Sequence, residues 1–509
     1  MHQNASLSAY PARLVVAGGG TAGWMAAAAL ARFLPPGSTI CLVESEAIGT
    51  VGVGEATIPQ IRMFNAGLGI DEDDFLRATQ GTIKLGIEFD GWRVAGERYL
   101  HAFGTIGRPL GLIGFHHYWL RARALGVAGR LGDYALNERA AYAGAFRRVD
   151  SAGEGAVPPM PYAFHFDAAL YAAYLRRYAE ARGVVRVEGR IVACDRTESG
   201  DLSALLLDGG RRVEGDFFLD CTGFGARLIG QELAVGRVDW SNLLPCDRAL
   251  AVASAPMERV PPYTRARAHS AGWQWRIPLR HRTGNGIVYS SAYLSDDEAA
   301  ARLIAGLDTP ADGDPRALRF VAGKREAFWE RNCVAVGLSS GFLEPLESTS
   351  IHLIQSAIAR LLQLLPGTGD SAARRDEYNR LAHVEMDRIR DFLVLHYAAN
   401  ERVGEPMWDG CRAAALPDEL ARKLRLWRES GVVSRRDDEL FAEPGWVQVL
   451  LGQGVTPSGW HPLADQLSER DLGVFLDAAA TVARRAGEAM PSHDQFLARL
   501  DARVAELTP

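Results

Sequence analysis

The sequence lacks several patterns that would place it in other classes of protein. No run of eighteen apolar residues occurs in its 509 residues, so we expect no membrane-spanning helix. Basic residues are not in excess, and the formal net charge of -6 disfavours nucleic-acid binding, which needs a clustered basic face. Residues 1–10 contain neither a basic segment nor an apolar one, so we expect no secretory signal and a cytoplasmic location.

Paired cysteines and metal-binding spacings are also missing. The six cysteines form no Cys-x-x-Cys pair, and most lie in apolar runs, which is typical of free thiols in a reducing compartment. There is no His-Glu-x-x-His, and His116-His117 has no partner ligand at a useful spacing. We therefore expect no metal site. Hydrophobic residues at 48% and charged residues at 23% are ordinary for a globular enzyme.

The N-terminal part of the chain contains a nucleotide-binding pattern. An expected strand at 14–17 leads into Gly18-Gly19-Gly20-Thr21-Ala22-Gly23, an Ala-rich helix over about 24–33, and a strand at 39–43 that ends at Glu44. The glycines permit a tight turn, and the helix N-terminus offers free N–H groups to a pyrophosphate. Glu44 is placed to accept hydrogen bonds from a ribose. The motif alone does not separate FAD from NAD.

Three further stretches carry candidate chemistry. Residues 82–90 alternate between apolar and polar, which predicts a strand with Lys84 on the face opposite the apolar residues; alone, this would be a solvated lysine. The turn at 344–350 lies between an expected strand at 334–337 and an expected helix at 351–365, so its N–H groups form an anion site. Trp273 and Trp275 alternate within 272–278, and alone would be two core tryptophans.

Together, these stretches resemble the flavin-dependent halogenases, and the tryptophan halogenases most closely. The resemblance covers nearly the whole chain and is strongest over 14–103 and 273–353. It implies an α/β fold, with an FAD-binding Rossmann-like, flavin-monooxygenase-like box and a mostly helical C-terminal cap. We expect the box at 1–366, including a substrate-side sheet at about 95–165 and 240–330, and the cap at 367–509. Expected cap helices are 375–401, 417–430, 468–486 and 492–507.

The resemblance also implies roles for single residues. Reduced FAD (FADH2), O2 and chloride or bromide would give hypohalous acid, which Lys84 would hold or convert to a haloamine and direct to an electron-rich aromatic carbon. Glu347 would aid deprotonation and orient Lys84. The backbone at Thr349 and Ser350 would hold the halide. Substrate contacts are expected from His101, Phe103 and Trp460, and tunnel walls from Trp273 and Trp275. Expected FAD contacts are Gly18, Gly20, Thr21, Ala22, Gly23, Glu44, Ala47, Gly54, Glu55, Ile191, Leu338 and Ile351.

The substrate side departs from the family pattern. Tryptophan halogenases carry a tyrosine-rich segment that grips the amino acid, whereas residues 437–446 of this chain contain no tyrosine. An indole-type substrate is expected, and another aromatic or a peptide stays open. No second dinucleotide pattern is present, so a separate NAD(P)H-dependent flavin reductase would supply FADH2; a homodimer is one option for the assembly. A flavin-dependent aromatic hydroxylase and a non-catalytic FAD-binding module are the alternatives.

Overall fold

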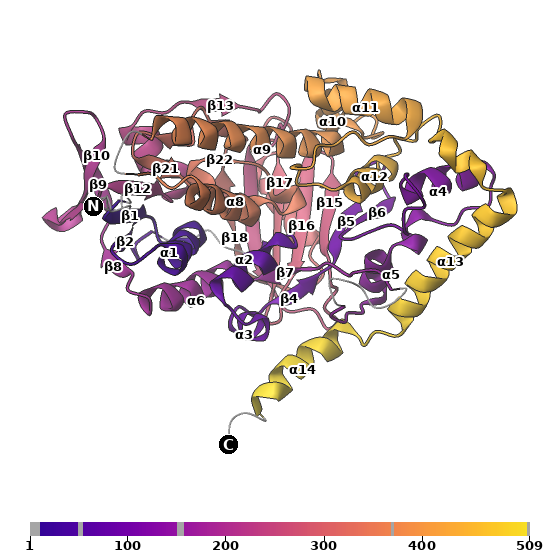
Figure 1. The fold of residues 1–509 in the computed structure, drawn as a ribbon, viewed down its shortest axis with the longest axis horizontal. Coiled ribbons are helices and arrows are strands. Elements are labelled where there is room, and N and C mark those ends of the chain that lie inside the picture. The colour runs from indigo at the N-terminus through magenta and orange to yellow at the C-terminus, as the bar shows by residue number, and fades with distance from the viewer. Residues whose placement is uncertain (1–10, 49–53, 150–156, 368–370, 506–509) are drawn as a thin grey trace, which may run out of the picture.

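The computed structural model describes residues 11–48, 54–149, 157–367 and 371–505. Two large sheets lie side by side, with α1 (Thr21–Phe33) at one end of the molecule and α13 (Glu469–Glu488) at the other (Figure 1). Residues 49–53 of the ribbon expected along the flavin lie outside the described residues. No helix of the described part is long and apolar enough to cross a membrane.

The six-stranded sheet carries the nucleotide end. Its order is β20-β21-β12-β1-β2-β8, and every neighbouring pair is parallel except β20–β21. Helix α1 (Thr21–Phe33) connects β1 to β2, so the expected strand–glycine turn–helix–strand unit is confirmed. The strands are β1 (Arg13–Ala17), β2 (Thr39–Glu44), β8 (Val185–Glu188), β12 (Phe217–Asp220), β20 (Trp329–Glu330) and β21 (Cys333–Ala335).

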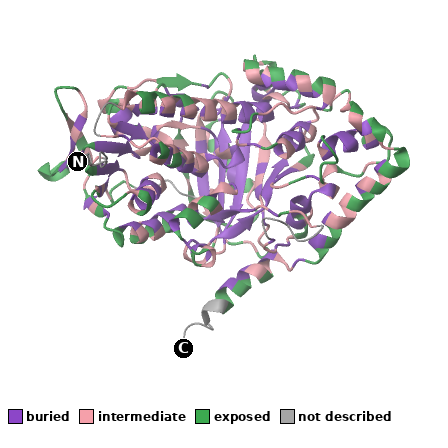
Figure 2. Cartoon of the chain, viewed as in Figure 1, coloured by how far each residue is buried: buried purple, intermediate pink, exposed green. Residues whose placement is uncertain are grey.

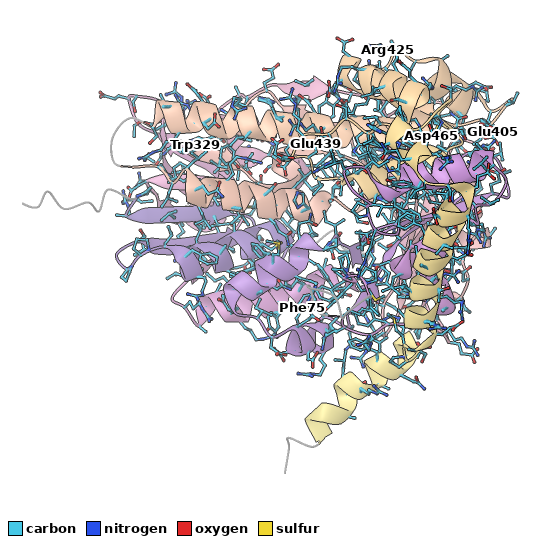
Figure 3. All side chains as sticks on the ribbon, turned by 45° about the vertical axis from the view of Figure 1, so that its right-hand side comes forward. Phe75, Trp329, Glu405, Arg425, Glu439 and Asp465 are labelled. Atoms are coloured by element: carbon cyan, nitrogen blue, oxygen red, sulfur yellow. The ribbon has the colours of Figure 1, made fainter. Side chains whose placement is uncertain are left out.

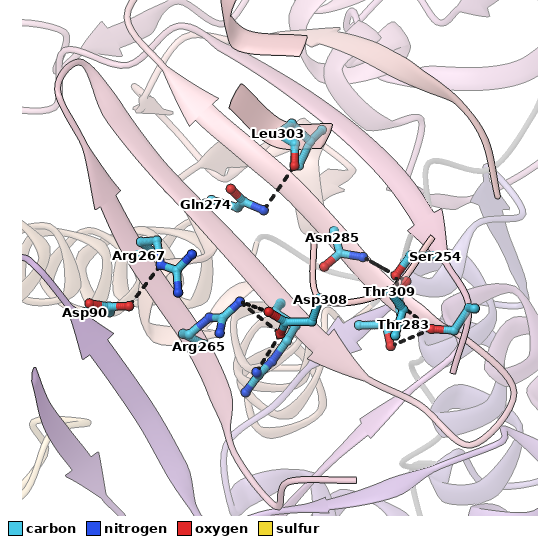
Figure 4. Close-up of polar contacts among 12 residues, drawn as sticks. Asp90, Ser254, Arg265, Arg267, Gln274, Thr283, Asn285, Leu303, Asp308 and Thr309 are labelled. Atoms are coloured by element: carbon cyan, nitrogen blue, oxygen red, sulfur yellow. Dashed lines mark hydrogen bonds and ion pairs between the residues drawn. The ribbon is translucent and has the colours of Figure 1, made fainter. Parts of the chain in front are cut away.

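The seven-stranded sheet has the order β18-β14-β17-β16-β15-β5-β6 and is antiparallel except for the pair β15–β5. Trp273 and Trp275 alternate along β16 with polar residues that point to the opposite face. On that face, Arg265 pairs with Asp308 and Arg267 pairs with Asp90 (Figure 4). The strands are β5 (Gly86–Asp90), β6 (Arg98–Ala102), β14 (Arg248–Ser254), β15 (Thr264–His269), β16 (Gly272–Pro278), β17 (Thr283–Tyr289) and β18 (Ala311–Arg319).

The strand expected over 82–90 is two strands that belong to different sheets. β4 (Thr82–Lys84) pairs with β7 (Ala163–Phe166), which also pairs with β3 (Glu55–Ala56), whereas β5 joins the large sheet. The chain changes sheets at Leu85, whose N–H donates to the Pro262 carbonyl. The expectation of one strand was wrong. The two small remaining sheets contain β9 (Ile191–Arg196), β10 (Leu202–Leu207), β11 (Arg212–Glu214), β13 (Arg237–Asp239), β19 (Gly323–Arg325) and β22 (Gly341–Phe342).

Helices cover both sheets and form the C-terminal part. α8 (Ser350–Gln363) and α9 (Ala372–Ala398) lie together. Trp329, labelled in Figure 3, packs edge-on against Tyr378 of α9 with ring centroids 5.7 Å apart. The four expected cap helices correspond to α9, α11 (Asp418–Ser430), α13 (Glu469–Glu488) and α14 (His493–Ala505), and α10 (Pro406–Ala413) and α12 (Glu443–Gly452) were not expected. The other helices are α2 (Gln60–Leu68), α3 (Glu72–Ala78), α4 (Phe115–Ala124), α5 (Leu136–Ala143), α6 (Ala168–Glu180) and α7 (Asp296–Ala305).

The buried hydrophobic side chains form a large and a small cluster, and buried segments fill the middle of the molecule (Figure 2). The large cluster extends from Leu14 on β1 to Leu500 on α14, and the small one includes Val15 of β1 and Phe218 of β12. The box and cap boundary at 366/367 stays a prediction.

Candidate active site

The turn between β1 and α1 is shaped for a phosphate group. Gly18 has a φ of +108°, and a Cβ there would lie 2.3 Å from the Cys221 carbonyl oxygen. A Cβ at Gly23 would lie 1.8 Å from the Gly18 carbonyl oxygen. Gly20 caps α1 without any side-chain hydrogen bond, and a Cβ there would meet nothing within 4 Å. Open space in front of free helix N–H groups fits the pyrophosphate of FAD.

Other expected FAD residues border this turn or the second sheet. Glu44 ends β2, where its carboxylate accepts from Trp24 Nε1 at 3.2 Å and pairs with Arg186. The 337–339 turn, which contains Leu338, lies against α1, because a Cβ at Gly337 would be 2.9 Å from the Ala22 Cβ. Gly54, at a φ of +105°, packs beside Ile277, close to the tryptophan-bearing strand. Ile191 begins β9, Ile351 is buried in the first turn of α8, and Ala47 is exposed.

Lys84 is completely buried at the end of β4. Its Nζ donates to the Thr57 carbonyl oxygen at 2.9 Å and to Ser348 Oγ at 2.7 Å, and lies 5.5 Å from the centroid of the Phe103 ring. Burial lowers the pKa of Lys84 to about 7, although the nearby Glu347 carboxylate opposes the change. The ammonium therefore joins the segment after Gly54 to the 344–350 turn.

The 344–350 turn brings the other expected residues to the lysine. A single helical turn at 345–347 is followed by Ser348 in the left-handed region, with φ 58°, a conformation that costs about 1–3 kcal/mol for such a residue. Helix α8 begins directly afterwards, and its cap residue Thr349 makes no side-chain capping bond. Thr349 Oγ1 is buried without a hydrogen-bond partner among the described residues. The turn therefore presents free donors beside Lys84, which suits an anion.

Glu347 is held by two histidines and not by Lys84. His101 Nδ1 lies 2.9 and 3.0 Å from the two carboxylate oxygens, and His396 Nε2 lies 2.9 Å from Oε1. Burial acts to raise the pKa of the Glu347 carboxyl, but the nearby histidines, His101 first, outweigh it and lower the pKa to about 2. His396 on α9 was not expected, because no motif surrounds it in the sequence. His101 was expected as a substrate wall, and it is also a partner of Glu347.

Aromatic side chains from the C-terminal helices close this region. Phe441 stacks on Phe392 with centroids 3.8 Å apart, and the His101 ring lies 5.7 Å from that of Phe392. Trp446 meets Phe392 edge-on at 4.8 Å. Sequence analysis missed these three aromatic residues. Trp460, by contrast, donates its Nε1 hydrogen to Asp465 at 2.9 Å and does not join this set of contacts.

The expected tunnel residues are fixed from the same turn. Trp273 Nε1 donates to Glu344 Oε2 at 2.8 Å, and the Tyr397 hydroxyl donates to the same oxygen at 2.5 Å. Burial raises the pKa of Glu344 to about 7 despite these two hydrogen bonds. Trp275 follows with its ring centroid 6.1 Å from that of Trp273. Trp273 is therefore held by a residue of the same turn that carries Glu347.

Comparisons with known proteins agree with this geometry. The tryptophan halogenase family model matches residues 13–469. The chain belongs to the tryptophan halogenase family. It is 50% identical to the solved structure of Xcc4156, a flavin-dependent halogenase from Xanthomonas campestris, with a TM-score of 0.94 over 96% of this chain and 98% of that one. BrvH, a flavin-dependent halogenase from Brevundimonas sp. BAL3, is 44% identical, with a TM-score of 0.93 over 96% and 99%.

A curated relative extends the family match to a named activity. Tryptophan 6-halogenase SttH from Streptomyces toxytricini is 34% identical over 97% of this chain and 99% of that protein. Membership of this family makes the protein a flavin-dependent enzyme that halogenates aromatic substrates with FADH2, O2 and a halide. The family match and the mixed α/β fold confirm the expected class, and favour it over a hydroxylase or a non-catalytic FAD-binding module.

Proposed function

We propose that Lys84 directs the halogen to the aromatic carbon and that Glu347 removes the proton from the same carbon. The observation that supports this proposal is that Lys84 is completely buried and donates to Thr57 and Ser348. Ser348 directly follows Glu347 in the chain. When bound, reduced FAD supplies hypohalous acid from O2 and halide. A buried amine with a pKa of about 7 offers either an ammonium that hydrogen-bonds this acid or an amine that forms a haloamine.

The neighbouring residues supply binding and exclusion of water. Free N–H groups at the start of α8 would hold the halide at Thr349 and Ser350. Trp273 and Trp275 would wall the passage by which the hypohalous acid reaches Lys84 and keep substrate away from the flavin. The N-terminus of α1 and the Gly54–Glu55 segment would hold the cofactor. Glu55 there is a carboxyl group whose pKa burial raises to about 7.

The substrate we propose is a neutral, electron-rich aromatic of the indole type. A cavity of about 170 Å³ adjoins the aromatic cluster and is lined in part by Phe441 and Trp446. Its charged groups already have partners: Arg388 pairs with Asp438 at 2.7 Å, and Glu439, labelled in Figure 3, pairs with Lys423 at 2.5 Å. Glu385 pairs with Arg360 at 2.6 Å. The carboxylate and the ammonium of a free amino acid would have to compete with these ion pairs for charged partners.

We also propose a separate NAD(P)H-dependent flavin reductase as the source of FADH2, and a cytoplasmic location. All six cysteines are free, which suits a reducing compartment. A homodimer remains a prediction that size measurement in solution would test.

The test of the proposed chemistry compares Lys84→Met with Lys324→Met, which removes a second, largely buried lysine. Each variant receives chemically reduced FAD, O2, bromide and a mixture of indole and tryptophan, and mass spectrometry counts bromine in the products. We expect Lys84→Met to lose at least 100-fold of its bromination rate, and Lys324→Met to retain it. A dye that traps free hypobromous acid should still react with Lys84→Met, because the lysine acts after the oxidant forms.

Three results would count against the proposal. Unchanged bromination by Lys84→Met would remove the role of the lysine. Products heavier by one oxygen and free of bromine would indicate a hydroxylase. Preferred bromination of tryptophan over indole would contradict the neutral substrate class.

A further inference from the structure

His396 is a buried titratable group that contacts Glu347 and has no role in the mechanism so far. Its ring is fully buried and packs against Phe89 and Phe392, with centroids 4.7 and 5.3 Å away. His396 Nδ1 lies 2.8 Å from the Phe392 carbonyl oxygen. Because a carbonyl oxygen only accepts, Nδ1 must carry the hydrogen. When the ring carries a single proton, that proton therefore lies on Nδ1 and Nε2 has a bare lone pair.

That lone pair faces the carboxylate. Nε2 lies 2.9 Å from Glu347 Oε1, yet no aligned hydrogen bond joins them, and Nε2 has no hydrogen-bond partner within the described part of the chain. Two acceptors buried at this distance are unfavourable in the absence of a proton between them. One added proton converts the contact into a charge-assisted hydrogen bond, whichever atom carries it.

We propose that His396 is a positioning residue for proton transfer: it shares the proton that Glu347 removes from the halogenated carbon. The inference rests on the proposed role of Glu347. As the proton leaves, the electron pair of the C–H bond returns to the ring, and the proton moves to Oε1 and is shared with Nε2. The hydroxide released from hypohalous acid takes a proton from the Lys84 ammonium and leaves as water. The shared proton then restores Lys84 through solvent, so aromatic and hypohalous acid give haloaromatic and water.

Among the described residues, the other groups that face the pair either have partners already or keep their own proton. His101 Nδ1 contacts both carboxylate oxygens, and Lys84 donates to Ser348 and Thr57. The Tyr99 hydroxyl is buried without a hydrogen-bond partner in the described chain, and burial raises its pKa well above the usual range, so it keeps its proton. Directly after α12, Gln453 Nε2 donates to the backbone carbonyl of His396 at 2.7 Å. Nε2 of His396 is the remaining acceptor beside Glu347.

The test is a hydrogen isotope ratio measured in His396→Gln. The amide keeps polarity and approximate size but cannot take a proton. Indole and ring-deuterated indole compete in one tube with reduced FAD, O2 and bromide, and mass spectrometry gives the ratio of light to heavy product. In the wild type we expect halogen attack to decide the rate and the ratio to be close to unity. In His396→Gln we expect turnover to fall about 10-fold or more and the ratio to rise to about 2 or more.

His383→Gln is the matched control, because His383 lies on the same helix and contacts only the Glu326 carbonyl among its hydrogen-bond partners in the described chain. It should keep a ratio near unity. A fall in turnover with an unchanged ratio would reduce His396 to a packing role and overturn the inference. If His396→Gln does not fold, nitrogen NMR of histidine-labelled wild type decides: a proton on Nε2 at neutral pH overturns the inference, whether or not Nδ1 also carries one. Unchanged turnover in Glu347→Gln would instead remove the proposed role of Glu347.

Discussion

Lys84 differs from the other lysines of this chain in its partners. The sequence contains three lysines, and Lys324 and Lys423 are paired with Asp387 and Glu439 at 2.6 and 2.5 Å. Lys84 instead donates to a carbonyl and a hydroxyl, which carry no charge. Burial is therefore not balanced by a contacting carboxylate, and the neutral amine is populated near pH 7. Burial of this amine therefore lowers the free energy of unfolding while it populates the neutral form of the side chain.

This imbalance predicts that Lys84→Met stabilises the protein. The folded-state pKa of about 7 lies below the usual value of 10.5, so between these values the unfolded chain binds more protons. Stability of the wild type should therefore rise as pH increases from 7 to 10. Methionine removes the cost, and we expect its Tm to be a few °C higher at pH 7, with a smaller gain at pH 10. Thermal unfolding at both pH values measures this, and an equal or lower Tm at pH 7 would contradict it.

The identity of motif residues was predictable, but the contacts that connect them were not. Lys84 and Glu347 were expected from two separate stretches. The structure brings them together, because Lys84 donates to Ser348, the residue after Glu347. His396 lies about 50 residues beyond Glu347 on a helix whose sequence carries no motif. Trp446 was not expected, yet it contacts the aromatic cluster, and the substrate role of Trp460 stays a prediction. Such contacts arise from packing between distant segments, which local patterns do not encode.

At the scale of elements, the two glycines Gly20 and Gly23 of the β1–α1 turn have different roles. Gly23 is needed by the fold, because a Cβ would overlap the Gly18 carbonyl, whereas Gly20 borders open space. We expect Gly20→Ala to keep the Tm of the flavin-free protein within about 1–2 °C but to weaken FAD binding at least 10-fold, because the methyl group enters the phosphate space. Gly23→Ala should lower the Tm itself. Flavin titration and thermal unfolding distinguish these outcomes, and tight FAD binding by Gly20→Ala would contradict the prediction.

Strongly patterned elements were predicted better than buried ones. Helices α11 and α13 have one apolar face, so their period is visible in the sequence, and their ends agree within two residues. Helix α12 is buried along most of its length, from Gly445 to Leu450, so it shows no polar face and was missed. β4 and β5 share one alternating pattern, yet all eight of their residues are buried. Burial on both faces hides the point where the chain changes sheets.

For the whole molecule, the continuous core predicts that box and cap unfold together. The hydrophobic cluster includes Leu14 of β1, Trp273 of β16, Phe392 of α9 and Leu500 of α14, with no division at residue 367. Separation of the cap would expose Phe392 and Trp446 together with the histidine-held Glu347.

We therefore expect flavin-free protein to show one calorimetric transition, with equal calorimetric and van't Hoff enthalpies. His493→Gln, which removes bonds from α14 to Ile83 and Val260, should lower that transition without splitting it. Two resolved transitions would show that the box and the cap are independent folding units.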